Sequence, residues 1–265
     1  MLKALTRHGI VADLLTGVSV GAINTVCYAA DPTARGVERL EAIWQQLTRH
    51  NVFPTPKLRG WFGIAAGRGH LVEPTALTAL LTSSLPVQSF EQLRRPCVVV
   101  ATDVLGGTAV ELSRGALVPA LLATAAIPGI FPPVRIAERL LMDGGVAYQA
   151  PFAAALERGA TRIYVLPTGY SCARRDPPSG AIGLALHALN MLTVAKLIGS
   201  IHFYESRVEL RVVPPLCPID VSPLDFGHTR ELIDRAEEQT DAWIRSDEFA
   251  GSHVPHQLEP HSHAA

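Results

Sequence analysis

Short apolar runs and longer helix-like runs alternate along the chain, separated by glycine and proline turns. Continuous apolar stretches of a few residues predict buried strands, and apolar positions at helical spacing predict helices. The predicted strands are Val11–Leu15, Pro96–Asp103, Thr108–Leu112, Arg139–Gly145, Thr161–Leu166 and Arg207–Val213. The predicted helices are Ala22–Ala30, Glu38–Leu47, Pro74–Leu81, a short one from Leu117, Pro151–Arg158, Ala181–Phe203 and Thr229–Ile244. This alternation predicts an α/β layered fold with a mostly parallel sheet.

Three segments depart from this pattern. Ala181–Phe203 is apolar apart from one narrow polar stripe, which predicts a buried helix with little room for water. Asn51–Glu73 has proline, glycine and aromatic residues without a period, which predicts a long loop or lid. The end of the chain, residues 247–265, is rich in histidine and is predicted to be a disordered tail. One domain is therefore expected over residues 1–246.

Composition excludes several classes of protein. Apolar residues make up 48% of the 265 residues and charged residues 18%, which is typical of a globular protein. The formal net charge is −1 and no basic run is present, so nucleic-acid binding is not expected. No apolar stretch of membrane-spanning length is free of proline or charge, and the N-terminus has no signal-like run. These features predict a soluble, cytoplasmic protein.

Cysteine and histidine spacing gives no metal-binding motif. The four cysteines lack any C-x-x-C pair and are expected to be buried apolar residues: Cys27, Cys97, Cys172 and Cys217. The histidines of the tail are expected to be solvated, with adventitious metal binding as the alternative: His253, His256, His261 and His263. Neither a metal nor a cofactor is predicted.

The first candidate for chemistry is a serine between two glycines, Gly17-x-Ser19-x-Gly21, between the first predicted strand and helix. This pattern is typical of a nucleophile elbow, in which the serine lies on a tight strand-to-helix turn and a Cβ at the flanking positions would be crowded. The helix dipole and the backbone N–H of Val20 would stabilise an oxyanion beside Ser19. The alternative is a tight turn in which Ser19 only caps the helix.

The second candidate is the turn Asp143-Gly144-Gly145, which ends the predicted strand "LLMD". Ligands of open α/β sheets bind at the carboxyl ends of strands, so Ser19 and Asp143 are expected to meet at one edge of the sheet. A serine hydroxyl needs a base to act as a nucleophile, and Asp143 would supply it. The alternative is a structural Asx turn in which Asp143 accepts hydrogen bonds from the glycine amides.

Four segments in order along the chain resemble the patatin-like phospholipase family: "GVSVGAINT" (Gly17–Thr25), "ATDVLGGTAVELSRGALVPALLATAAIPGIFPPV" (Ala101–Val134), "LLMDGGVAYQAP" (Leu140–Pro151) and "LDFGHTRELIDRA" (Leu224–Ala236). The resemblance implies a three-layer α/β/α sandwich that hydrolyses acyl esters of lipids with a Ser-Asp dyad, without histidine or metal. It makes Ser19 the nucleophile and Asp143 the base. A lipid ester is then the expected substrate, with peripheral contact to a membrane surface and the Asn51–Glu73 loop as the lipid entrance.

One departure from the family concerns the oxyanion loop, a glycine-rich segment of the form G-G-G-x-R-G that precedes the elbow in the family. The chain starts at "MLKALTRHGIVADLL", which resembles only the end of the helix that follows this loop, so roughly 20 residues of a βαβ unit are missing. Either the true start lies upstream and the sequence is truncated, or the chain is a shortened homologue. Losing one oxyanion donor costs about 10²–10³ in rate, so impaired turnover is expected. The alternative is a patatin-fold protein that binds lipids or partners without turnover.

The other enzyme class that uses G-x-S-x-G is the α/β-hydrolase, with a Ser-Asp-His triad in this chain order. Three histidines follow Asp143 and are candidates for its base: His187, His202 and His228. That fold places several strands before its elbow, whereas Ser19 lies close to the start of this chain. Each of the three histidines is more simply explained as a structural residue.

Overall fold

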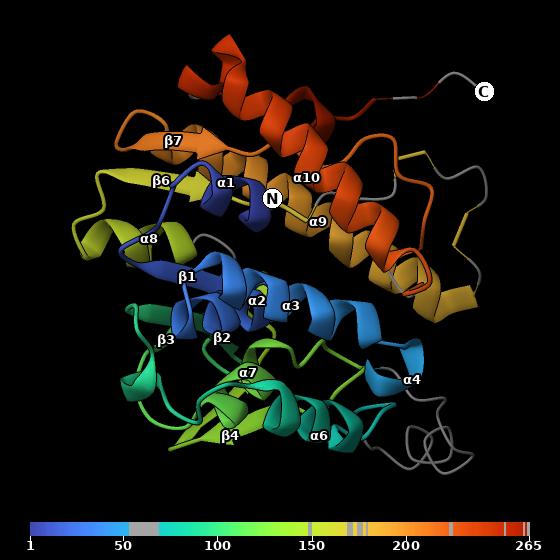
Figure 1. The fold of residues 1–265 in the computed structure, drawn as a ribbon. Coiled ribbons are helices and arrows are strands. Elements are labelled where there is room, and N and C mark those ends of the chain that lie inside the picture. Colours follow the sequence, from blue (N-terminus) through green and yellow to red (C-terminus); the bar gives the residue numbers. More distant parts are fainter. Residues whose placement is uncertain are drawn as a thin grey trace. The chain divides into compact units, whose positions relative to one another are not determined.

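The structure is a computed structural model of the 265-residue chain (Figure 1). It describes residues 1–52, 69–147, 150–168, 172–173, 177–178, 180–222, 225–251, 253–261 and 263. Most of the predicted lid, residues 53–68, lies outside the described residues. The chain divides into two units, which are treated separately below: the elbow unit (Val11–Ala155) and the terminal unit (Met1–Ile10 with Leu156–Ala265).

Helices and strands alternate along the chain as the sequence predicts. The helices are α1 (Leu2–Arg7), α2 (Ser19–Ala30), α3 (Ala34–Gln46), α4 (Arg49–Val52), α6 (Thr75–Ser84), α7 (Leu117–Thr124), α8 (Ala150–Glu157), α9 (Gly180–Tyr204) and α10 (Thr229–Arg245). The strands are β1 (Leu15–Val18), β2 (Cys97–Asp103), β3 (Ala109–Leu112), β4 (Val134–Ile136), β5 (Arg139–Met142), β6 (Arg162–Val165) and β7 (Glu209–Val212). Short 3₁₀ turns are η1 (Phe90–Gln92), η2 (Gly144–Ala147), η3 (Asp247–Ala250) and η4 (His256–Leu258).

A five-stranded sheet forms the centre of the elbow unit, with β2 in its middle. β1 pairs with β2 in parallel, with Val18 opposite Val100, whereas β3 and β5 pair with β2 in antiparallel orientation and β4 pairs with β5. β2 is buried along nearly all its length, as expected for a continuous apolar strand covered on both faces. The prediction of β3 as its hairpin partner is confirmed.

Helices cover both faces of this sheet. On one face, Val98 and Val100 of β2 pack against Ala154 of α8. On the other face, Ala101 of β2 packs against Ala123 of α7, and α7 contacts α2, which lies along β1 and β2. The α/β fold with three layers is therefore confirmed; the described strand pairs are mixed, with β1–β2 and β6–β7 parallel and the others antiparallel.

In the terminal unit, β6 and β7 form a parallel pair, and α1 packs along α10. The core of this unit includes three buried residues: Leu5 of α1, Val213 directly after β7, and Trp243 of α10. Arg7 adds ion pairs to Glu237 and Asp241 of α10, at 2.6 and 2.7 Å. The helix predicted over Thr229–Ile244 is thus confirmed, and it packs against α1 from the N-terminal end of the chain.

The prediction that Ala181–Phe203 is a buried helix is wrong about burial. α9 has the predicted helical structure, but only 17% of its most apolar 18-residue stretch is buried. By length and composition alone, Gly183–Tyr204 could cross a membrane. Its exposed side chains include four large apolar ones: Leu184, Met191, Leu192 and Phe203. A helix that is apolar on nearly all sides has no amphipathic pattern to orient it, so the sequence could not show which face is exposed.

Other boundaries and environments also differ from the prediction. The first strand begins at Leu15, not Val11, and continues through Gly17 to the elbow. β6 is half-exposed and pairs with β7 among the described strands, although a buried strand was predicted. In the structure, the described part of the tail forms η3 and η4, and Leu258 is only 1% exposed.

Candidate active site

Ser19 lies at the junction of β1 and α2 in a strained backbone conformation. It is the first residue of α2, directly after Val18 of β1, and its φ is +51°. A residue other than glycine in this left-handed region costs about 1–3 kcal/mol and persists only where surrounding contacts hold it. The strand, sharp turn and helix are the context expected of a nucleophile elbow.

Thr124, at the end of α7, holds the strained turn in place. The backbone N–H of Ser19 donates to Oγ1 of Thr124 at 2.9 Å, and that hydroxyl donates to the carbonyl oxygen of Val100 at 2.5 Å. Thr124 is fully buried, so the hydroxyl satisfies two backbone groups that water does not reach. The sequence analysis did not assign this role; a hydroxyl within the apolar segment "LVPALLAT" was the available signal.

The two glycines that flank Ser19 differ in their surroundings. A Cβ on Gly17 would lie 2.6 Å from Oγ1 of Thr25 and 2.7 Å from Cα of Ala22, because the first turn of α2 folds back over β1. A Cβ on Gly21 would meet nothing within 4 Å. The prediction that both flanking positions are crowded is therefore correct for Gly17 and wrong for Gly21.

Asp143 lies within hydrogen-bonding distance of Ser19, although 124 residues separate the two in the chain. Oγ of Ser19 donates to Oδ2 of Asp143 at 2.7 Å. The carboxyl group is largely buried, with the residue 7% exposed, while Ser19 is half-buried. The structure thus brings together the hydroxyl and the carboxylate that the sequence analysis paired.

Four further hydrogen bonds fix Asp143. Its other carboxylate oxygen, Oδ1, accepts from the backbone N–H of Gly145 at 2.8 Å, which is the Asx-turn contact considered above. Its backbone carbonyl accepts from Oγ1 of Thr102 at 2.9 Å and from the N–H of Val146 at 3.3 Å, and its N–H donates to Ala126 at 3.0 Å. The Asx turn and the contact with Ser19 therefore coexist, one on each carboxylate oxygen.

The sequence predicted that this contact arises at a shared edge of parallel strands, and the structure shows a different arrangement. β5 is antiparallel to β2, with Met142 opposite Thr102, so Asp143 approaches the middle of β2 from the opposite direction to Ser19. Gly144 allows this approach, because a Cβ there would lie 2.1 Å from the carbonyl oxygen of Val100. A short strand, whose antiparallel direction an apolar run cannot show, therefore completes the site.

Burial is the main influence on the pKa of the Asp143 carboxyl group. Desolvation raises the pKa of Asp143 above its ordinary value of 3.8, and the hydrogen bonds from Ser19 and Gly145 oppose that shift. A carboxylate with a raised pKa is a stronger base toward a hydroxyl proton. The site thus holds a base of increased strength against a serine hydroxyl.

Two features of α2 favour negative charge beside Ser19. The N–H groups of its first turn have no partner within the helix, and the helix dipole is positive at this end. Val20 is the second residue of α2 and is 36% exposed, so its N–H lies in the first turn at an accessible part of the chain. Negative charge beside Ser19 is therefore favoured at this end of the helix.

Comparison with known proteins shows the family to which the chain belongs. The profile of the patatin-like phospholipase family matches residues 1–156, which include the whole elbow unit. The chain belongs to the patatin-like phospholipase family. The match ends before residues 224–236, so the resemblance noted for that segment is not part of it.

Among curated proteins, the patatin-like chain is similar to NTE family proteins of mycobacteria whose names describe them as uncharacterized. It is 45% identical over 153 residues to one from Mycobacterium tuberculosis, covering 58% of this chain and 40% of the relative, and equally similar to one from Mycobacterium bovis. A second protein of Mycobacterium tuberculosis is 29% identical over 155 residues, covering 56% of this chain and 24% of the relative. This chain thus spans less than half of the length of these relatives.

The histidines considered for an α/β-hydrolase triad are not part of the described patatin-like site. His187, His202 and His228 all belong to the terminal unit, where His202 and His228 are exposed beside acidic residues. In the described part of the elbow unit, His70 bonds to Glu73 at 3.2 Å. The described partners of the two carboxylate oxygens of Asp143 are the hydroxyl of Ser19 and the backbone N–H of Gly145.

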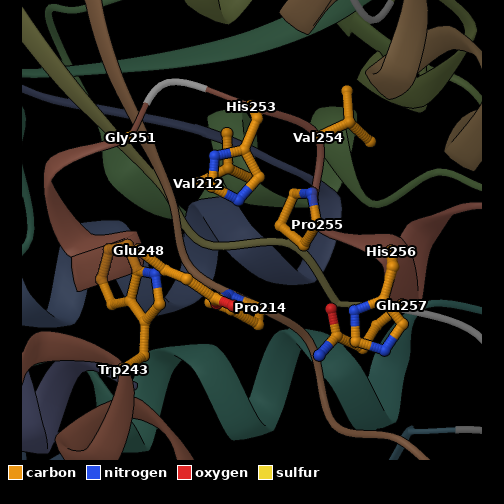
Figure 2. Close-up of a pocket in the computed structure, with 10 residues that line it drawn as sticks. All are labelled: Val212, Pro214, Trp243, Glu248, Gly251, His253, Val254, Pro255, His256 and Gln257. Carbon is orange, nitrogen blue, oxygen red and sulfur yellow. The ribbon is translucent and has the colours of Figure 1, made fainter. Parts of the chain in front are cut away.

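A cavity of about 150 Å³ lies in the terminal unit (Figure 2). Figure 2 shows Trp243 of α10 at the lower left and Pro214 after β7 near the centre, with His253 of the tail at the top and His256 and Gln257 at the right. His253 and His256 are among the lining residues. The cavity shows that the tail packs on the terminal unit, but it offers no group of the dyad.

Proposed function

We propose that this chain is a serine lipid acyl hydrolase in which Ser19 is the nucleophile and Asp143 the general base. The proposal is supported by family membership, which gives a lipid hydrolase at the level of the family. The observation that carries it is the 2.7 Å hydrogen bond from Ser19 Oγ to the buried carboxylate of Asp143 at a strained elbow. The left-handed backbone at Ser19 costs free energy to maintain and supports the proposal together with this hydrogen bond.

The first half of the reaction forms an acyl-enzyme. Oγ of Ser19 attacks the ester carbonyl carbon while Oδ2 of Asp143 takes its proton. The carbonyl oxygen becomes an oxyanion, which accepts a hydrogen bond from the N–H of Val20. The tetrahedral intermediate collapses with loss of the alcohol, which leaves with the proton held by Asp143.

The second half releases the fatty acid. A water molecule attacks the acyl-enzyme carbonyl, and Asp143 again accepts a proton. Collapse of the second tetrahedral intermediate breaks the ester bond to Ser19 Oγ, which recovers its proton from Asp143. No cofactor takes part in either half of this proposed cycle.

Contact with a lipid surface is the proposed mode of substrate access, with the protein otherwise cytoplasmic. The support is the exposed apolar side of α9, with Leu184 and Met191 each 57% exposed and Leu192 61% exposed. Replacing Leu184 and Leu192 with serine should reduce co-sedimentation with phosphatidylcholine vesicles. Leu105→Ser is the matched control, because Leu105 is 92% exposed in a turn of the elbow unit. Equal binding by all variants would exclude α9 as the membrane contact.

The direct test of function is hydrolysis of short-chain p-nitrophenyl esters and of phospholipid in mixed micelles. Ser19→Ala should abolish both activities while the circular dichroism spectrum and melting temperature stay close to those of the parent chain. Ser83→Ala, an exposed serine at the end of α6, is the control for a neutral serine replacement. An active Ser19→Ala variant would overturn the assignment.

Reduced turnover by this chain remains a prediction from the sequence. Its test is a comparison of the chain with a version extended by a strand and a glycine-rich loop of the family's form. An increase of about 10²-fold or more in kcat would support a missing oxyanion donor. Unchanged turnover would show that the described residues provide the donors the reaction needs.

A further inference from the structure

We propose that Cys172, Cys217, His261 and His263 bind one zinc ion that holds the end of the chain to the terminal unit. Each residue offers one ligand atom, and the four atoms lie within 4.8 Å of one another. The set was not predicted, because its members come from distant segments: 45 residues separate the two cysteines and 44 separate Cys217 from His261. Two thiols and two imidazoles are the donors that select zinc at a tetrahedral site.

Four of the six distances between the ligand atoms are close to those of a tetrahedral site. With Zn–S of about 2.3 Å and Zn–N of about 2.0–2.1 Å, tetrahedral geometry places the sulfurs about 3.8 Å apart, the nitrogens about 3.3 Å apart and sulfur about 3.5 Å from nitrogen. The two Sγ atoms are 3.8 Å apart and the two Nε2 atoms 3.1 Å apart. Sγ of Cys217 lies 3.2 and 3.3 Å from the two Nε2 atoms. All four separations agree within a few tenths of an ångström.

A contact outside the four ligand atoms fixes the ring of His261. Its Nδ1 lies 2.7 Å from the backbone carbonyl oxygen of Glu259, to which it donates. Metal-binding histidines commonly donate their second ring N–H in this way, which leaves the lone pair of Nε2 for the metal. The two rings are nearly perpendicular, at 88°, so their Nε2 atoms converge on one point without stacking.

The three segments that carry the ligands are joined by other contacts. The N–H of Ala173 donates to the carbonyl oxygen of Ile219 at 2.8 Å, which ties the segment of Cys172 to that of Cys217. The tail is anchored before His261 by the buried side chain of Leu258. The ligands are therefore positioned by the fold of the terminal unit as well as by their own side chains.

Four protein ligands leave no coordination position for water or substrate, so the proposed ion is structural and not catalytic. Binding displaces the protons of the two thiols, and two thiolates with two neutral imidazoles then balance the charge of Zn²⁺. The ion would join the tail to the segments after β6 and β7. This proposal does not depend on the dyad, and its failure would leave the hydrolase proposal unchanged.

A disulfide between Cys172 and Cys217 is the competing explanation of their contact. Both cysteines are free thiols in the structure. The disulfide would remove both sulfurs as zinc ligands, so the two explanations exclude one another and the test distinguishes them. A disulfide also gives no reason for two imidazole nitrogens to converge on the same sulfur.

The experiment is metal analysis of the whole chain, expressed without an affinity tag and purified under reducing, anaerobic conditions. We expect close to one zinc ion per chain by mass spectrometry of the metal. With Co²⁺ in place of zinc, we expect the intense d–d absorption of a tetrahedral site together with thiolate-to-cobalt charge transfer. Both measurements use the parent chain, so neither depends on the folding of a variant.

Variants then identify the ligands. Cys217→Ser and His263→Ala should each lose most of the bound zinc and melt at a lower temperature than the parent chain. His253→Ala and His256→Ala are matched controls, because both histidines lie in the same tail but line the cavity of Figure 2. Zinc content near zero in the reduced parent chain, a Cys172–Cys217 disulfide that persists under those conditions, or equal loss in the control variants would each overturn the proposal. The last of these outcomes would mean adventitious binding by the tail only.

Discussion

The Ser19–Asp143 pair and the Cys172–His263 group differ in how the chain assembles them. Each half of the dyad lies in a short contiguous motif at the end of a strand, and β2 fixes both halves in place. The four cysteine and histidine ligands lie in loops and in the tail, and no two of them form a local motif except His261 and His263. A site whose residues lie in contiguous motifs at strand ends can therefore be predicted from the sequence. A site whose residues come from separate loops can be recognised only in the structure.

The two regions also differ in their relation to known proteins. The family match covers residues 1–156 and includes the elbow unit, whereas the cysteine and histidine ligands all lie beyond it. The proposed hydrolase chemistry thus rests on the shared part of the chain, and the proposed zinc site on a part that the family match does not include. The measurements below separate the two regions, beginning with the largest expected effect.

Asp143→Asn should lower ester hydrolysis by roughly 10³–10⁴-fold, because the amide cannot accept the proton of Ser19. The fold should be retained, since asparagine fills the same space and can keep the contact with Gly145. Measured kcat and melting temperature check both parts. Activity within about tenfold of the parent chain would contradict Asp143 as base and would leave the Asx turn as its only role.

The pH dependence should reflect the burial of Asp143. Because burial raises its pKa above 3.8, the acidic limb of kcat/KM should lie above the pH expected of an ordinary aspartate. Activity should rise with pH through this pKa, whereas the contribution of Asp143 to stability should fall. Protonated Asp143 favours the folded state below pH 3.8, and that contribution is lost as the pH rises through the raised folded-state pKa. A pH–rate profile measured with a soluble ester, with an acidic limb at or below pH 3.8, would contradict this environment.

The two elbow glycines should respond differently to alanine. Gly17→Ala should destabilise the fold by about 1–3 kcal/mol, because its Cβ would overlap Thr25 and Ala22. Gly21→Ala should be neutral or stabilise by up to about 1 kcal/mol, because alanine is the better helix former and the space is open. Urea unfolding of both variants measures the contrast, and equal destabilisation would show that the elbow packs differently.

The last prediction concerns cysteine reactivity and compares the thiols of the two units. Burial raises the pKa of Cys27 to about 11 and that of Cys97 to about 12. Both thiols should react with a disulfide reagent at least about 10²-fold more slowly than free cysteine. Cys172 and Cys217, which are half-buried, should react readily only after a chelator removes the proposed zinc. Rapid labelling of four thiols without chelator would contradict both statements.

The sequence predicted the elbow unit well because its strands are strongly apolar and its turns carry glycines. "PCVVVATD" reads as a buried strand, and both glycine turns lie where the structure places them. The antiparallel direction of β5 could not be predicted, since an apolar run has no direction. Thr124 was missed for a related reason: its role depends on hydrogen bonds to Ser19 and Val100, far from it in the chain.

The terminal unit was predicted less well because its signals are ambiguous. α9 is apolar on nearly all sides, so burial was the natural expectation, yet Leu192 is 61% exposed while Ser200 is fully buried. The histidine-rich tail has the composition of a solvated segment, and only the packing of Leu258 shows that it is anchored. Cysteine spacing excluded the common zinc motifs and could not reveal ligands that are brought together by three separate segments.

The most direct test of the account is fluorophosphonate labelling followed by mass spectrometry of the modified peptide. A phosphonate reacts with a serine only when a base activates it, so the label reports the hydroxyl and its partner together. The account predicts a single adduct at Ser19 in the parent chain, and strongly reduced labelling in Asp143→Asn. An adduct at another residue, or equal labelling of Ser19 without the Asp143 carboxylate, would contradict it.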